Sequence, residues 1–144
     1  MMESKRCVLV VDDDRAMRDM VVALLEDAGL EARSAEGADR ALEQLRDREF
    51  DAVLSDVRMP GRSGIEMLGE IHEIRESTPI ILMTAFGSID SAVEAMQAGA
   101  FDYITKPFKR DALLVTLERA FALRSLEEEN RRLRRAVDRT SSFG

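Results

Sequence analysis

Short apolar runs alternate along this chain with longer segments of helical periodicity, and this alternation constrains the fold more than any other feature. The runs are residues 8–11, 52–54, 80–83 and 101–104, with a weaker one at 30–35. Such a pattern is typical of parallel strands joined by crossover helices. With 45% hydrophobic residues in a chain of 144, one core can be filled. We therefore predict an α/β fold of (βα)5 type with a doubly wound, five-stranded parallel sheet.

Five segments between and after these runs carry apolar residues on one helical face. Glycines and a serine mark their ends, with Gly29 and Gly99 as C-terminal stops and Ser88 as an N-cap. The faces comprise Met17, Met20, Val21, Leu24, Leu25 and Ala28; Ala38, Ala41, Leu42 and Leu45; Ile65, Leu68, Ile71 and Ile74; Ile89, Val93 and Met96; and Leu113, Leu114, Leu117 and Phe121.

Charge and cysteine content narrow the functional classes. The 28 acidic and 21 basic residues give a net charge of -7, which repels phosphate backbones and argues against nucleic-acid binding by this segment. Cys7 is the single cysteine and cannot form an internal disulfide. No apolar stretch reaches the length of a signal peptide or membrane helix. We expect a cytoplasmic protein without membrane contact.

Polar residues follow the predicted strands where the carboxyl ends of a parallel sheet bind ligands. The first strand runs into Asp12, Asp13 and Asp14, the third ends in Asp56, the fourth in Thr84, and Lys106-Pro107 follows the fifth. Gathered carboxylates repel one another and need a hard cation, for which Mg²⁺ is suited. A lysine and a hydroxyl beside them make a phosphoryl site, in which a central carboxylate can be the nucleophile.

Each of these residues alone has an ordinary structural explanation. An aspartate at a strand end often forms a turn or caps a helix, Thr84 could simply end a strand, and Lys106 could be a solvated loop charge. Tyr103 could be a core residue with a wet hydroxyl. Their coincidence at every relevant strand end favours the functional interpretation.

The motifs that these residues form resemble those of the receiver domains of bacterial response regulators, over about the first 124 residues. They are residues 10–14 (VVDDD), 55–61 (SDVRMPG) with Gly64, 83–85 (MTA) and 103–108 (YITKPF). The resemblance implies the flavodoxin-like strand order 2-1-3-4-5. It also implies a domain that catalyses only its own phosphorylation and dephosphorylation, and that receives its phosphoryl group from a histidine kinase.

The same resemblance assigns roles in the site. It implies that Asp56 is the phosphoacceptor and that Asp13, Asp56 and the backbone carbonyl of Arg58 bind Mg²⁺ directly, with Asp12 acting mainly through water. It further implies that Thr84 and Lys106 hold the phosphoryl oxygens, and that the Lys106-Pro107 bond is cis.

Four positions concern switching and the lifetime of the phosphoryl group. Thr84 and Tyr103 would form a switch, in which Tyr103 moves as Thr84 is drawn toward the phosphoryl group. Arg58 and Phe86 border the path of a hydrolytic water in such domains, and their size would favour a long lifetime. The alternative that Arg58 simply reaches solvent has equal weight.

The C-terminal part changes to a charged helix with an apolar seam. Leu123, Leu126, Asn130, Leu133 and Val137 repeat at spacings of three and four, which is typical of a coiled coil whose Asn favours a parallel dimer. In this frame Glu129 and Arg134 could pair across the seam. The alternative is a single solvated helix with Glu127–Arg131 and Glu128–Arg132 pairs, each worth about 0.2 to 0.5 kcal/mol.

We therefore divide the chain into a receiver (1–124), a helical coiled-coil linker (125–140) and the start of an absent downstream domain (141–144). The linker resembles the junction into the AAA+ ATPase domain of sigma-54-dependent activators of the nitrogen-regulator class. No phosphate-binding Gly-rich loop occurs in these residues. We expect a homodimer through the fourth helix, fifth strand, fifth helix and linker, in which phosphorylation changes the dimer arrangement and controls the output domain.

Two other classes of function are alternatives to a phosphorylated receiver. Asp12-x-Asp14 also matches the signature of haloacid-dehalogenase phosphatases, with Asp12 as the nucleophile, but Ala16 stands where that family has Thr or Val. A pseudo-receiver that serves only in dimerisation would require a broken phosphorylation site, and here the site is complete.

Overall fold

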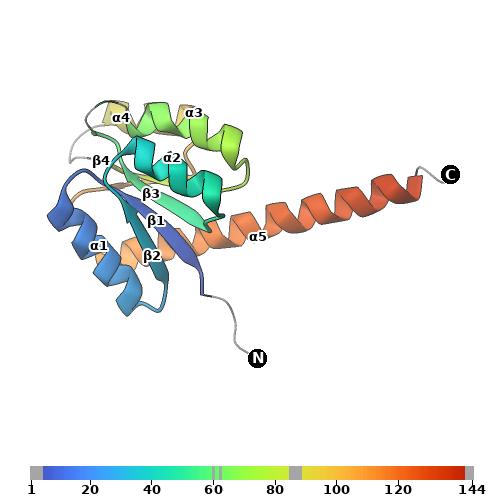
Figure 1. The fold of residues 1–144 in the computed structure, drawn as a ribbon, viewed down its shortest axis with the longest axis horizontal. Helices are drawn as coiled ribbons and strands as arrows, with labels where there is room; N and C mark the ends of the chain where they lie inside the picture. Colours follow the sequence, from blue (N-terminus) through green and yellow to red (C-terminus); the bar gives the residue numbers. More distant parts are fainter. Residues whose placement is uncertain (1–4, 60, 62, 85–88, 142–144) are drawn as a thin grey trace.

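Strands and helices alternate strictly in a computed structural model that describes residues 5–59, 61, 63–84 and 89–141. The strands are β1 (Cys7–Val11), β2 (Glu31–Ala35), β3 (Ala52–Asp56), β4 (Ile80–Thr84) and β5 (Asp102–Thr105). The helices are α1 (Arg15–Asp27), α2 (Ala38–Asp47), α3 (Gly64–Ile74), α4 (Ile89–Gln97) and α5 (Arg110–Ser141). All strand pairs are parallel, in the order β2-β1-β3-β4-β5. Figure 1 labels β1 to β4 of this sheet. The predicted fold and strand order are confirmed.

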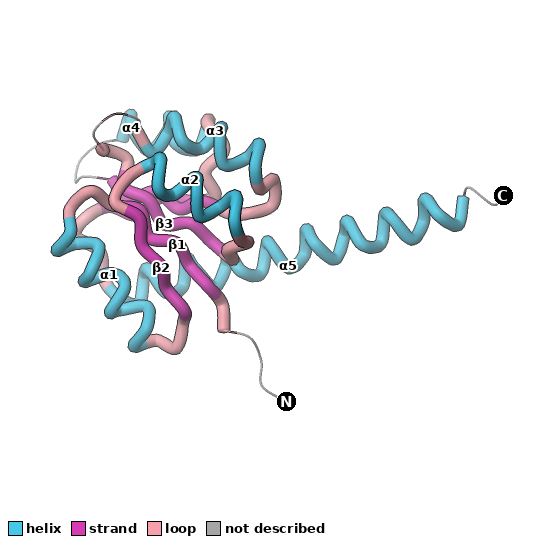
Figure 2. Tube along the Cα trace, in the orientation of Figure 1, coloured by secondary structure: helices cyan, strands magenta, loops and turns pink. Residues whose placement is uncertain are grey.

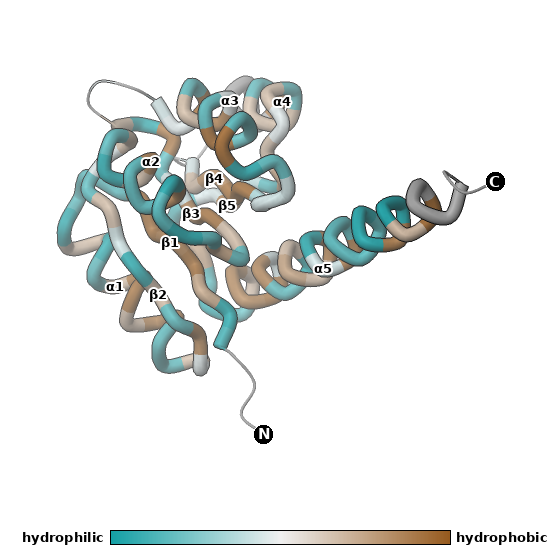
Figure 3. Tube along the Cα trace, turned by 45° about the vertical axis from the view of Figure 1, so that its right-hand side comes forward, coloured by the Kyte–Doolittle hydropathy of each residue, from teal (hydrophilic) through white to brown (hydrophobic). Residues whose placement is uncertain are grey.

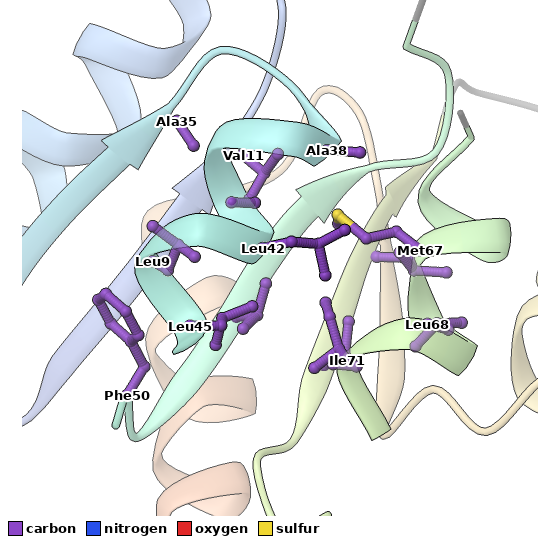
Figure 4. Packing of buried hydrophobic residues seen from close by; sticks show 14 of the residues in the cluster. Leu9, Val11, Ala35, Ala38, Leu42, Leu45, Phe50, Met67, Leu68 and Ile71 are labelled. Carbon is purple, nitrogen blue, oxygen red and sulfur yellow. The ribbon is translucent and has the colours of Figure 1, made fainter. Parts of the chain in front are cut away.

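The sheet separates two apolar layers because successive strand residues point to opposite faces. Leu9 and Val11 pack with α2 and α3, as Figure 4 shows, whereas Val8 and Val10 pack with α1 and α5. The strand residues between Cys7 and Val11 are all buried, as expected for a parallel sheet covered on both sides.

Capping residues mark the start of α1 and the ends of α1 and α4. The Asp14 carboxylate accepts hydrogen bonds from the backbone N–H groups of Ala16 and Met17 and so begins α1. Gly29 and Gly99 have φ of 88° and 103°, the left-handed conformation that ends helices at glycine, which confirms both predicted stops. The N-cap predicted at Ser88 lies outside the described residues.

Three residues of the predicted apolar faces are not part of the core. Met20 of α1 is 50% exposed, and Val93 and Met96 of α4 are 52% and 45% exposed. Among the α4 side chains that the structure describes, which begin at residue 93, the buried one is Ala95.

Helix α5 continues without a break through the predicted domain boundary at residue 124 and extends well beyond the sheet (Figure 2). Its outer part is largely hydrophilic with isolated apolar positions (Figure 3). Of these, Leu126, Leu133 and Val137 are 67%, 56% and 64% exposed. Among the described helices, none has the combination of length and apolar character that a membrane span needs.

The ion pairs of this outer helix differ from the Glu127–Arg131 and Glu128–Arg132 pairs considered above. Glu128 pairs with Arg124 at 3.0 Å, and Arg131 reaches Glu76 at 3.2 Å on the body of the domain. Arg132 pairs with Glu129. The two expected pairs are therefore wrong in their partners: Arg131 is taken by Glu76 of the domain body, and Glu128 and Arg132 pair with other residues of the same helix.

Candidate functional site

Asp12 occupies the first position after β1 and is fully buried. Its Oδ2 lies 3.3 Å from the Lys106 ammonium, and its Oδ1 accepts the Asp14 backbone N–H at 2.9 Å. Its backbone carbonyl accepts a hydrogen bond from the Arg18 guanidinium at 2.8 Å. Asp12 is thus held at both carboxylate oxygens and at its main chain.

Asp56 is the last residue of β3 and keeps a partly accessible carboxylate. Its Oδ2 lies 3.3 Å from the Lys106 ammonium, and its Oδ1 accepts the Arg58 backbone N–H at 3.3 Å. Burial raises the pKa of Asp56 above its ordinary value, Lys106 opposes this rise, and the nearby Asp12 adds to it. The Asp56 side chain is 16% exposed and that of Asp12 is 0% exposed, so Asp56 is the more accessible of the two carboxylates beside Lys106.

Asp12, Asp13 and Asp56 come together as the sequence predicts. Each contributes a carboxylate oxygen to a cluster in which these atoms lie within 4.8 Å of one another. Oxygen donors with two or more negative charges suit Mg²⁺, which binds one or two carboxylates and retains waters. The donor set therefore fits this ion, with the exposed Asp13 on the solvent side.

The start of α3 packs directly on the backbone at Asp56. A Cβ added to Gly64 would lie 2.5 Å from the Asp56 backbone oxygen, and the Gly64 N–H donates to the Val57 carbonyl at 2.9 Å. Only glycine permits this approach. The glycine that closes the β3 motif thereby fixes the loop carrying Arg58.

Thr84, the last residue of β4, has a buried hydroxyl with no hydrogen-bond partner among the described residues. A buried polar atom without a partner is uncommon and calls for an explanation, and a bound phosphoryl oxygen would supply one. The Thr84 carbonyl accepts the Lys106 N–H at 2.7 Å, which ties the fourth and fifth strand ends together. The predicted cis Lys106-Pro107 bond is confirmed.

The predicted switch and tuning residues have different surroundings. Tyr103 is 38% exposed on β5 and borders a surface groove with Asp102, Pro107 and Lys109. Arg58 is exposed and lines an open groove of about 630 Å³ next to Asp13, so both interpretations of Arg58 still stand. Phe86 lies outside the described residues.

Sequence reasoning missed two arginines. Arg18 contacts the Asp12 backbone. Arg124 pairs with Asp51 at 3.1 Å, at the amino ends of the strands and so away from the site. The spacing of six residues between Asp12 and Arg18, across a helix start, was the available signal for the first. Nothing in the local pattern distinguishes Arg124 from the other arginines of α5.

The model of the response regulator receiver domain matches residues 8–118, which include every strand end described above. Regulatory protein AtoC of Escherichia coli (strain K12) is 39% identical over 137 residues, covering 95% of this chain and 30% of that protein. The C4-dicarboxylate transport transcriptional regulatory protein DctD of Pseudomonas aeruginosa is 41% identical over 131 residues, covering 90% of this chain and 28% of that protein. The chain thus spans about 30% of the length of such relatives.

Solved structures agree with these similarities. NtrX from Brucella abortus in complex with ADP has a TM-score of 0.85 at 37% identity, covering 90% of this chain and 30% of that one. A response regulator receiver domain protein from Clostridium thermocellum has a TM-score of 0.80 at 31% identity, covering 84% and 98%.

Proposed function

The chain belongs to the response regulator receiver domain family, and from this premise we propose that it takes a phosphoryl group from a histidine kinase onto Asp56. The observation that carries the proposal is the Asp56 carboxylate itself. It is partly accessible, lies 3.3 Å from the Lys106 ammonium, and belongs to a cluster with Asp12 and Asp13. Among the clustered carboxylates it alone combines access with a cationic neighbour that can also reach a transferred group.

In this proposal Mg²⁺ is held by Asp13, Asp56 and the Arg58 backbone carbonyl, with Asp12 acting mainly through water. The ion supplies neutralisation of negative charge on the phosphoryl oxygens. An Asp56 oxygen forms the bond to phosphorus while the bond from phosphorus to the kinase imidazole nitrogen breaks. Lys106 neutralises one equatorial oxygen.

The Thr84 hydroxyl would donate a hydrogen bond to another phosphoryl oxygen, and this is the basis of the proposed switch. A hydroxyl that is unpartnered in the absence of the group and bonded in its presence makes a contact in one state only, which is what shifts a conformational equilibrium. Tyr103 lies one strand away and half in solvent, so its ring can follow Thr84 inward. The domain catalyses only its own phosphorylation and dephosphorylation.

A second copy of the chain is the proposed partner of the outer part of α5. Leu126 and Leu133 are more than half exposed, and a helix segment of some 27 residues spans about 40 Å at about 1.5 Å per residue. Val115 and Leu123, also exposed, continue the stripe toward α4 and β5. The homodimer would therefore use the α4/β5/α5 surface together with the coiled-coil linker, in parallel.

The downstream output is proposed from the relatives, because the chain covers less than a third of their length. AtoC and DctD carry the names of regulatory proteins. We assign this chain to the sigma-54-dependent activators, with residues 1–124 as receiver, 125–140 as linker and 141–144 as the start of an AAA+ ATPase domain. Residues 142–144 lie outside the described residues. We further propose that the protein is cytoplasmic and that this segment makes no direct nucleic-acid contact.

The test of phosphorylation uses acetyl phosphate and Mg²⁺ with intact-mass measurement. Wild type should gain one phosphoryl mass, and Asp56→Asn should gain none. Asp14→Asn is the matched control. It removes a carboxylate close to the site, and because the Asp14 side chain caps α1 and Asn also caps helices well, the helix should be kept. Label on Asp12, mapped by peptide analysis, would favour the phosphatase alternative, and equal labelling of Asp56→Asn would refute the assignment.

The test of the dimer is light scattering of the full chain and of a chain truncated after Arg124, each with and without beryllofluoride. We expect a dimer for the full chain that truncation weakens. A monomeric full chain in both states would refute the dimer. A dimer indifferent to truncation would show that the receiver surface alone holds the pair.

A further inference from the structure

We propose that Arg18 is a positioning residue of the metal site, which holds the peptide between Asp12 and Asp13 so that the Asp13 carboxylate faces the cation. The inference rests on the proposed function, because it assigns a task within that same site. Arg18 does not reach a carboxylate of the cluster in any described contact. Its guanidinium instead donates to the Asp12 backbone carbonyl at 2.8 Å.

The geometry of the strand end explains why this peptide needs to be held. Neighbouring side chains on a strand point to opposite faces, yet Asp12 and Asp13 both contribute oxygens to one cluster. The backbone must therefore leave the strand conformation at this peptide, and β1 indeed ends at Val11. Any rotation of the peptide plane swings the exposed Asp13, whereas the buried Asp12 is fixed by its own contacts.

Four hydrogen bonds fix Asp12. Its N–H donates to the Ala35 carbonyl at 3.2 Å, its Oδ1 accepts the Asp14 N–H at 2.9 Å, its Oδ2 accepts from the Lys106 ammonium at 3.3 Å, and its carbonyl accepts from Arg18. Of these four, only the bond from Arg18 is made by a side chain to the Asp12 main chain. The Arg18 backbone is itself fixed, since its N–H donates to the Asp14 carbonyl at 2.9 Å in the first turn of α1.

The positive charge of Arg18 makes positioning and electrostatics predict opposite changes in Mg²⁺ affinity. A guanidinium near a cation site repels the cation, so removing it should strengthen Mg²⁺ binding if electrostatics alone mattered. Loss of positioning has the opposite effect, because groups that orient metal ligands typically contribute about 10- to 100-fold in metal affinity. A weaker site after removal of a positive charge therefore identifies positioning.

Arg15 offers a matched control on the same helix turn. Its side chain is 85% exposed and pairs with Asp19 at 3.8 Å. Arg15→Met removes the same charge close to the site without touching the Asp12 carbonyl. We expect calorimetric titration of the full chain with Mg²⁺ to show roughly tenfold or greater weakening for Arg18→Met and unchanged or slightly tighter binding for Arg15→Met.

Two further measurements separate positioning from a general structural defect. The metal-free Arg18→Met protein should have a lower thermal midpoint than Arg15→Met, because it loses a partly buried hydrogen bond from a charged donor, but it should be folded at the assay temperature. Phosphorylation by acetyl phosphate should then recover for Arg18→Met at saturating Mg²⁺. Recovery of the rate would show that the lost quantity is metal affinity. A rate that stays low at saturating Mg²⁺ would overturn the proposal.

The remaining outcomes are equally decisive. Equal or tighter Mg²⁺ binding by Arg18→Met, with wild type binding normally, overturns the positioning role and leaves the proposed function standing. A wild type that does not bind Mg²⁺ overturns both. If Arg18→Met does not fold, the Mg²⁺ affinities of Arg18→Lys and Arg15→Lys are compared instead, since both variants keep the charge and only the first alters the donor to Asp12. Weaker binding by Arg18→Lys alone supports positioning, and equal binding by the two variants overturns it.

Discussion

Replacement of Arg124 by methionine should destabilise the protein and loosen the outer part of α5 from the sheet. The Arg124 side chain is 9% exposed and pairs with Asp51 at 3.1 Å, with Glu128 at 3.0 Å and with Glu49 at 3.6 Å. Asp51 in turn accepts the Cys7 backbone N–H at 2.8 Å at the start of β1. Arg124 thus joins the first residue of the sheet to the helix that leaves it.

The magnitude follows from the burial of each partner. The side chains of Glu49 and Glu128 are 66% and 47% exposed, so these pairs contribute about 0 to 1 kcal/mol each. The Asp51 side chain is 18% exposed, and a hydrogen bond between charged groups contributes about 1.5 to 3 kcal/mol. Because Asp51 keeps the Cys7 N–H and Arg6 at 3.4 Å, it is not left unpaired. We expect a loss of about 2 to 4 kcal/mol.

The assay is urea unfolding at one fixed protein concentration, because dimer formation would otherwise change the apparent stability. A double-mutant cycle of Arg124→Met with Asp51→Asn isolates the pair, and its coupling energy should be about 1.5 to 3 kcal/mol. Arg132→Met is the control, since Arg132 and its partner Glu129 are 75% and 50% exposed. This control should change stability by less than about 0.5 kcal/mol.

Hydrogen exchange extends the same prediction to the linker. If Arg124 fixes the direction of the outer helix, the amides of residues 125–137 should exchange faster in Arg124→Met than in Arg132→Met. A coupling energy below about 0.5 kcal/mol, or equal exchange in the two variants, would refute the reasoning.

Three further predictions concern the phosphoryl site. Asp56→Asn should be more stable than wild type at pH 7 without Mg²⁺. Burial raises the pKa of Asp56 above its ordinary value of 3.8, so the folded wild type binds the carboxyl proton more tightly than the unfolded chain does. Wild type therefore loses stability as the pH rises from the unfolded to the folded pKa of Asp56. Urea unfolding at several pH values should show the difference closing below about pH 4, and a difference that grows on acidification would contradict it. Asp13→Ala should weaken Mg²⁺ binding by about tenfold or more and more than Asp12→Ala, and the reverse order in a calorimetric titration would exchange their roles. The Tyr103 ring should move inward when beryllofluoride binds, and the same rotamer in crystal structures with and without it would count against the switch.

The site could be predicted because a parallel sheet leaves few arrangements for its strand ends. Once residues 8–11, 52–54 and 80–83 are parallel strands, Asp12, Asp56 and Thr84 must lie at one edge. Their meeting is therefore a consequence of topology, which the hydrophobic pattern already contains. The closeness of Gly64 to Asp56 could not be predicted in this way, because it depends on how α3 enters from its loop.

The ion-pair partners of long charged side chains could not be predicted from the sequence, because the fold decides which charges meet. An i,i+4 pair is worth about 0.2 to 0.5 kcal/mol, so a carboxylate brought near by tertiary structure easily displaces it. Arg131 lies four residues after Glu127 and yet pairs with Glu76. The exposure of Met20 and Val93 has a related cause, because a helix face wider than its contact with the sheet leaves its edges in solvent.

The sequence by itself determined the alternation of buried strands with helices, the glycine stops and the identity of the acidic cluster, since these follow from local periodicity and from the direction of parallel strands. The strand order came from the resemblance of the motifs to receiver domains. Only the tertiary structure decided that Asp12 is the buried carboxylate and Asp13 the exposed one, that Arg18 holds the peptide between them, and that Arg124 joins α5 to Asp51. The physical reason is that burial and long-range pairing depend on which surfaces meet in three dimensions, and a local pattern in one dimension does not specify them.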